Sequence, residues 1–326
     1  MTTPLPKTTP RAIGEPPLAR PGYGLMMAVI AAVMYSLANV SLRQLAERKD
    51  LDYAFLVMAC KAVATAVVAW LLIARGWTRN INLLPPIRFY PQLLIAAFCT
   101  AVLGNVVFQY ALTIGGLAIV MPTVFAMIIL TGAMLGWLVL REPVSPMLAA
   151  AMAVLISAII VLSFGADDAA EAAAGSRRPA AAGWVIATGI VSGFGYGCVG
   201  VIVRKTRLAG VSAAGTLVLI STSGVVGLGA VALARLGWST VAAAIAVDGV
   251  WLAAASVCNA VAFFAIAEAY EHLAVVRVNL VNSSQSAMCA IAGVVVFAEP
   301  ATGWLVFGTV LTLFGLAMVA YAKDRT

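Results

Sequence analysis

Charged residues and histidine are scarce in this 326-residue sequence. Asp, Glu, Lys and Arg together make up 10% of the chain, hydrophobic residues make up 63%, and His272 is the one histidine. Soluble domains carry about 25% charged residues, so the composition excludes a soluble protein and indicates many membrane-spanning segments. One histidine leaves no ordinary zinc site or catalytic triad to assemble. We therefore expect no cofactor, no metal and no enzymatic activity.

Paired cysteines and a signal peptide are also lacking. The five cysteines all fall inside apolar runs without paired spacing, which is typical of small buried residues rather than disulfides. Residues 1–21 have no apolar core and no small-residue cleavage site, so we expect a disordered cytoplasmic tail. The net charge of +7 lies mostly in connections between apolar runs, which gives no reason to expect a nucleic-acid partner.

Long apolar runs dominate what is present. Residues 91–114 and 117–140 form two of them, separated only by a corner at Gly115-Gly116, and each is long enough to cross a ~30 Å hydrocarbon layer as a helix. The same criterion predicts an all-α integral membrane protein with ten transmembrane helices. Their ranges are 22–42, 53–74, 91–114, 117–140, 144–164, 183–203, 212–235, 248–270, 275–297 and 302–322.

The runs form two similar halves. Glu142-Pro143 and Glu299-Pro300 lie 157 residues apart, and each closes a helix that follows a short corner. Tyr35 and Tyr196 are related by an offset of 161. We therefore predict five-helix repeats at 22–164 and 183–322, a polar linker at 165–182 and a cytoplasmic tail at 323–326. Because five is odd, the two repeats must be inverted in the membrane.

The distribution of Lys and Arg predicts the orientation. With the N-terminus inside, thirteen of them fall in cytoplasmic segments and six on the opposite side. This positive-inside bias predicts that both termini are cytoplasmic. Lys61 is the remaining cation, and it lies within a span.

A Tyr-Ala-Leu at residues 110–112, a corner, a mid-helix Pro122, a Glu-Pro and one more apolar run follow each other in the first half. This order resembles the EamA repeat of the drug/metabolite transporter superfamily, over about residues 22–321. The second half departs from it, because Asn279 stands in the place of Pro122 at the same offset. The resemblance implies a transporter with its substrate cavity between the repeats. It does not identify the substrate.

The ninth run is the least lipid-like. Asn279, Asn282, Ser283 and Ser286 follow the spacing i, i+3, i+4, i+7, so they share one face of a continuous helix. Polar groups do not face hydrocarbon, so this face lies against protein or water. We interpret it as a cavity wall, and the alternative is hydrogen bonding between helices.

Shorter polar stripes occur in three other runs. Tyr35 and Asn39 lie in the first run, Asn105 and Gln109 in the third, and Tyr196 in the sixth. In transporters that this chain resembles, these helices and the ninth line the central cavity. We therefore predict a substrate site formed by Tyr35, Asn39, Asn105, Gln109, Tyr196, Asn279, Asn282, Ser283 and Ser286.

Lys61 is the least expected residue, about 12 Å into its span at 1.5 Å per residue. A cation near the bilayer centre costs ~2.5–3.5 kcal/mol on insertion scales, so it requires a partner or water. Anion contact and gating are the functional interpretations. The alternative is a lysine that snorkels or caps carbonyls.

Glu268, His272 and Arg277 cluster near the cytoplasmic end of the eighth span. An acid and an imidazole four residues apart allow proton coupling, with protons as a second partner. The alternative is a solvated helix end with local ion pairs. The first span has no acid, so the cation/proton exchange that the resemblance implies for small multidrug pumps is disfavoured.

The resulting expectation is an inner-membrane secondary transporter, a monomer or weak dimer in contact with lipid. It would move a small polar or amphipathic metabolite, amino-acid-like or drug-like, with export as the direction that the resemblance implies. One alternative is an exchanger of phosphate-bearing anions, and another is a membrane scaffold or integral membrane enzyme. The residues do not distinguish proton coupling from exchange or facilitated diffusion.

Overall fold

The computed structural model describes residues 20–46, 51–164, 182–298 and 303–321, and all the regular structure in these ranges is helical. Seven of the described helices are long and apolar enough to cross a membrane. The chain is therefore an integral membrane protein by helix length and composition. Glu299-Pro300, the linker residues 165–181, residues 1–19 of the predicted N-terminal tail and the whole predicted tail 323–326 lie outside the described residues.

In the first half, α1 (Pro21–Leu45), α2 (Leu51–Trp77) and α5 (Pro146–Ser163) agree with the predicted spans within a few residues. The region predicted as spans 91–114 and 117–140 contains α3 (Tyr90–Phe98) and the longer helix α4 (Val107–Leu140). The predicted corner lies inside α4 at Gly116, where φ is 68° and ψ is −178°. Only glycine adopts this conformation without strain, so the corner needs no further loop residue.

A π-helical segment, Cys99–Val106, joins α3 to α4. The sequence predicted an uninterrupted α-helix here, since nothing in its apolar pattern distinguishes the two forms. π-Helical turns inside α-helices are frequent at functional sites. The wider turn changes the direction in which the side chains that follow it point. Asn105 belongs to this segment.

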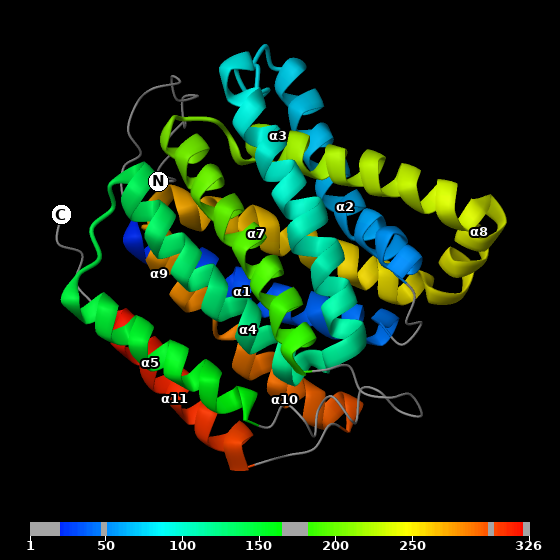
Figure 1. Cartoon of the computed structure of the whole chain (residues 1–326). Helices are drawn as coiled ribbons and strands as arrows, with labels where there is room; N and C mark the ends of the chain where they lie inside the picture. The colour runs from blue at the N-terminus through cyan, green and yellow to red at the C-terminus, as the bar shows by residue number, and fades with distance from the viewer. Residues whose placement is uncertain (1–19, 47–50, 165–181, 299–302, 322–326) are drawn as a thin grey trace, which may run out of the picture.

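The second half contains α7 (Ala182–Leu208), α8 (Ala213–His272), α9 (Val275–Asn282), α10 (Gln285–Phe297) and α11 (Gly303–Tyr321). α8 is 60 residues long and doubles back at Gly237, where φ is 75° (Figure 1). The gap predicted between 235 and 248 is therefore wrong, because Gly237 makes the reversal and helix resumes directly after it.

The predicted continuous helix at 275–297 is also interrupted. α9 ends at Asn282, two residues in a turn follow, and α10 begins at Gln285. The Ser283 hydroxyl donates a hydrogen bond to the Leu280 carbonyl, and the Ser284 hydroxyl donates one to the Val281 carbonyl. Local bonds of this type compete with regular helix, which accounts for the break.

Helices from the two halves lie against each other. α1 and α2 pack on α8, and α4 packs along α7, while α5 and α11 form a pair at the edge of the bundle (Figure 1). The outward surface is apolar, with exposed side chains such as Leu71, Trp137, Val250 and Phe314. An apolar surface of this extent suits lipid rather than water.

Candidate functional site: a polar cavity between the two halves

A cavity lies among the helices of both halves. Its volume, measured as the space open to the centre of a water molecule, is about 120 Å³. One water needs ~10–15 Å³ on this measure, so the cavity has room for a small organic molecule. Among the lining residues, α1, α2, the π-helical segment and α4 contribute from the first half, and α7 to α10 from the second.

Asn105 stands at the centre of the polar contacts on one wall. The Lys61 ammonium donates to its Oδ1 at 3.0 Å, and the Tyr196 hydroxyl donates to the same oxygen at 2.7 Å. Lys61 is 5% exposed and lies ten residues after the start of α2, about 15 Å along the helix. A lysine from the first half and a tyrosine from the second thus share one neutral acceptor.

A second polar chain crosses the cavity from α1 to α9. The Asn39 amide donates to Gln285 Oε1 at 3.1 Å, and the Gln285 amide donates to Asn282 Oδ1 at 2.6 Å. Amide groups carry both donors and acceptors, so these three side chains can form hydrogen bonds with either a donor or an acceptor on a ligand. Gln285 was not among the predicted site residues.

Tyr270 forms a third wall. Its hydroxyl donates to Asn279 Oδ1 at 2.7 Å, and a Cβ added at Gly200 would lie 2.5 Å from that hydroxyl oxygen. The absence of a side chain at Gly200 therefore allows Tyr270 to reach its partner across α7. Both Gly200 and Tyr270 line the cavity.

The predicted residues divide between cavity and interior. Tyr35, Asn39, Lys61, Asn105, Tyr196, Asn279 and Asn282 line the cavity. Gln109, Ser283 and Ser286 do not. The Gln109 amide instead donates to the Leu42 carbonyl at 3.1 Å.

Of the four residues predicted to share one face in the ninth run, the structure places Asn279 and Asn282 at the cavity and not the two serines. The spacing rule assumed one unbroken helix, and the turn after Asn282 changes the rotation of everything that follows. Gln285, which follows the turn, lines the cavity, whereas Ser283 and Ser286 do not.

Several lining residues gave no usable signal in the sequence. Asn259 is a lone amide in an apolar run, and its Nδ2 donates to Thr65 Oγ1 at 3.2 Å. Tyr270 lies among the charged residues at the end of α8, where the sequence suggested a helix end. Isolated polar residues have no periodicity to detect, so only the packing of helices distant in sequence brings them together.

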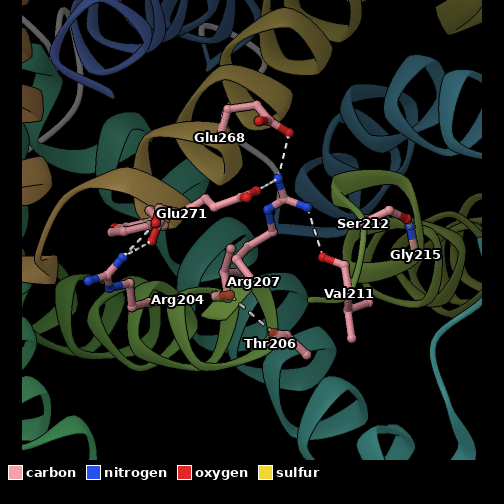
Figure 2. A network of polar contacts seen from close by, with 10 residues as sticks. Arg204, Thr206, Arg207, Val211, Ser212, Gly215, Glu268 and Glu271 are labelled. Atoms are coloured by element: carbon pink, nitrogen blue, oxygen red, sulfur yellow. Dashed lines mark hydrogen bonds and ion pairs between the residues drawn. The ribbon is translucent and has the colours of Figure 1, made fainter. Parts of the chain in front are cut away.

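A group of paired charges lies beside the cavity, and we call Glu142, Arg204, Arg207, Glu268 and Glu271 the ionic cluster. Arg204 donates to Glu142 at 2.8 Å. Arg207 donates to Glu268 at 2.8 Å and also to Glu271 (Figure 2). The second oxygen of Glu142 accepts the Val275 backbone N–H at 2.9 Å. These contacts tie the end of α4 to α7, α8 and α9.

The cluster also contacts the backbone next to the cavity. Arg204 donates to the Tyr270 carbonyl at 2.6 Å and to the Glu271 carbonyl at 3.0 Å, and Arg207 donates to the Val211 carbonyl at 2.8 Å (Figure 2). Tyr270 therefore belongs to both regions, with its hydroxyl in the cavity wall and its carbonyl in the cluster.

The three residues predicted to couple or gate near this end have different surroundings. Glu268 is ion-paired with Arg207. His272 packs edge-on against the Tyr23 ring, with the ring centroids 5.3 Å apart. Arg277 is half-buried on α9, and none of the three lines the cavity. The geometry agrees with the alternative of local ion pairs for Glu268.

Comparisons with known proteins bear on this architecture. Residues 22–164 match the family model described as the EamA-like transporter family. Over these residues, which are fewer than half of the chain, the sequence is similar to that family, which is part of the drug/metabolite transporter superfamily. The resemblance predicted over about residues 22–321 is thereby confirmed for residues 22–164, and the members of this family are transporters.

Two further comparisons concern the chain as a whole. A search of curated proteins finds no match. A protein crystal structure matches with 14% identity and a TM-score of 0.67, and the match covers 93% of this chain and 97% of that chain. At this identity the likeness shows a shared fold and carries no information on substrate.

Proposed function

We propose that the protein is a secondary transporter in an inner membrane, which exports a small polar or amphipathic metabolite by alternating access. The observation that carries the proposal is the cavity itself, which lies between the two halves and is lined by helices of both. In transporters built from repeats, the substrate binds near the bilayer centre at the interface of the repeats. We propose that Lys61, which lies ten residues after the start of the 27-residue helix α2, is near that depth.

Backbone geometry supports the inverted repeat that this mechanism requires. Left-handed residues recur at an offset of 157: Asn80 with Gly237, and Arg141 with Ala298. The corner at Gly116 has a counterpart at Leu273, where α8 ends in an extended conformation. We propose ten spans. The seven long helices are Pro21–Leu45, Leu51–Trp77, Ile87–Leu117, Val120–Leu140, Gly183–Leu208, Ala213–His272 and Val275–Phe297. Of these, Ala213–His272 (α8) counts as two passes because it reverses at Gly237, and the shorter helices α5 and α11 add one pass each.

Charge placement supports an arrangement with both termini in the cytoplasm. The ionic cluster consists of residues expected inside, whereas the pair between Arg235 and Asp52, 3.0 Å apart, consists of residues expected outside. Reporter fusions test this directly. A fusion after Asp168 should be periplasmic and one after Thr326 cytoplasmic, and finding both on one side would contradict the arrangement.

The ionic cluster supports a two-state mechanism. Glu142 comes from the first half, and both its arginine partner and its backbone donor come from the second. Contacts that bridge the halves at one end hold that end together and must separate if the halves rock. We propose that the cluster closes the cytoplasmic end of the cavity in this conformation.

The composition of the cavity disfavours the two alternatives. An exchanger of phosphate-bearing anions needs several cations, and Lys61 is the one charged residue among those that line the cavity. An enzyme needs converging acids, bases or metal ligands. The lining has no Asp, Glu or His, and no cluster of metal-ligating residues occurs in the described ranges.

Counterflow in proteoliposomes tests the proposal. Ligands of the purified full-length protein are first found by thermal shift, because a molecule that binds the fold stabilises it. Vesicles preloaded with such a ligand should accelerate uptake of its labelled form, and protein-free vesicles should not. A stabilising ligand that shows no counterflow, or that is chemically altered, would contradict transport.

A further inference from the structure

Lys61 is a cation without an opposite charge in the cavity that it lines. Its side-chain partner is the neutral Oδ1 of Asn105, which it shares with Tyr196. Arg204, Arg207 and Arg235, by contrast, each have a carboxylate partner. Among the described residues, no Asp or Glu lines the cavity. The glutamates of the ionic cluster are ion-paired with Arg204 and Arg207 and do not line the cavity.

A buried charge is stable only when paired or well hydrogen-bonded. An ammonium has three donors, and the Asn105 oxygen accepts one of them. A carboxylate would accept the remaining donors in charge-assisted bonds, which are stronger than bonds to a neutral amide. The site therefore fits a ligand that supplies one negative charge.

The rest of the cavity indicates what accompanies this charge. Its walls carry the rings of Phe108, Phe125 and Phe263 and the side chains of Met121 and Ile266, which suit an apolar body. An ammonium group on the ligand would find amide oxygens, hydroxyls and ring faces, but no acid. A second negative charge would find no second cation. Both a zwitterion and a dianion are thus less well matched than a monoanion.

We propose that Lys61 binds the carboxylate of the transported substrate, and that this substrate is a monocarboxylate with an apolar body and no cationic amine. The inference rests on the proposed function and narrows its substrate class. It assigns recognition of the anion to Lys61, with Asn105 holding the ammonium in place through its Oδ1.

A matched series of small probes tests the charge preference. 3-Phenylpropionate carries one negative charge, 3-phenylpropionamide none, phenylalanine adds an ammonium to the same carboxylate, and phenyl phosphate carries up to two negative charges. Binding to the full-length protein in detergent is measured by calorimetry at neutral pH. We expect 3-phenylpropionate to bind on the order of tenfold to a hundredfold more tightly than its amide, and more tightly than the other two.

Two lysine variants assign the preference to a residue. Lys61→Met removes the cavity cation, and Lys205→Met makes the same change at an exposed lysine on α7. The preference for carboxylate over amide should disappear in the first and remain in the second. Lys61→Arg keeps the charge and should retain part of it. Because Lys61→Met removes a buried charge, its melting temperature should be unchanged or raised, which guards against simple misfolding.

Each other outcome overturns the inference. Equal binding of acid and amide, a preference that survives Lys61→Met, tighter binding of phenylalanine or phenyl phosphate, or no binding of any probe would do so. The proposed function is tested separately by flux. Counterflow of phenylalanine without a carboxylate preference would leave transport standing and reject the monocarboxylate assignment. Binding of 3-phenylpropionate without counterflow of it or any other ligand would reject transport.

Discussion

The cavity and the ionic cluster lie next to each other, and their buried polar groups are paired in different ways. In the cluster, each arginine has a carboxylate partner and at least one backbone carbonyl. In the cavity, amides and hydroxyls pair with one another, and the one charge is left with a neutral partner. Paired charges fix helices in register, whereas an uncompensated charge leaves binding energy for a ligand. The difference separates what holds the fold from what receives the substrate.

The largest effect should come from breaking the ionic cluster. Arg204→Gln leaves Glu142 without its ion pair at a site where the two side chains are 13% and 14% exposed. Removing one partner of a buried pair costs ~3–5 kcal/mol, so we expect the unfolding free energy in mixed micelles to fall by about that amount. Arg235→Gln is the matched control, since Arg235 is 65% exposed, and should cost about 1 kcal/mol or less.

A second change shows whether the loss at Arg204 comes from charge. Adding Glu142→Gln to the Arg204→Gln variant removes the stranded carboxylate and should recover part of the stability. Equal, small losses for Arg204→Gln and Arg235→Gln would show that the cluster is no more than a set of surface pairs, and the contrast with the cavity would fail.

The next effect comes from converting the cavity into a region of paired charge. Asn105→Asp places a carboxylate where the amide oxygen now lies, 3.0 Å from the Lys61 ammonium. An internal ion pair would then replace the one offered by the ligand. We expect binding of 3-phenylpropionate, measured by calorimetry, to weaken on the order of tenfold or more, with the melting temperature maintained.

Asn105→Leu is the neutral control for that conversion. It removes the shared acceptor without supplying charge, so Lys61 and Tyr196 lose a partner and the protein should be destabilised by ~1–3 kcal/mol. The carboxylate preference should persist, because the need of Lys61 for a counter-charge persists. Loss of the preference in Asn105→Leu but not in Asn105→Asp would reverse the interpretation.

The sequence predicted more of the fold than of the site, and the reason is locality. The positions of the spans follow from runs of apolar residues, and the corner at Gly116 follows from two adjacent glycines. Both features therefore depend on residues that are close together in the sequence. Tyr35, Tyr196 and Lys61 also stand out within single helices. The ion pair between Arg204 and Glu142 joins residues 62 positions apart in the sequence, and no local pattern predicts it.

Backbone irregularity explains the remaining errors. A π-helical segment and a two-residue turn each change the rotation of the helix that follows, and both occur in this cavity wall. Hydrophobic periodicity assumes constant rotation, so its predictions fail beyond such a point. Asn279 and Asn282 precede the turn and line the cavity, whereas Ser286 follows it and does not.

The smallest effect tests this last distinction. Asn282→Ala removes a cavity amide that accepts from Gln285, so it should weaken binding of 3-phenylpropionate a few-fold by disturbing the chain to Asn39. Ser286→Ala removes a buried hydroxyl for which the described residues provide no hydrogen-bond partner. Its loss should leave binding unchanged and shift the unfolding free energy by about 0.5 kcal/mol or less, toward greater stability, because burying an unsatisfied hydroxyl is costly. Calorimetry and melting of the two variants side by side provide the measurement. Equal loss of binding in both would mean that the ninth span presents one continuous polar face to the ligand, in a conformation where the turn at Ser283-Ser284 is absent.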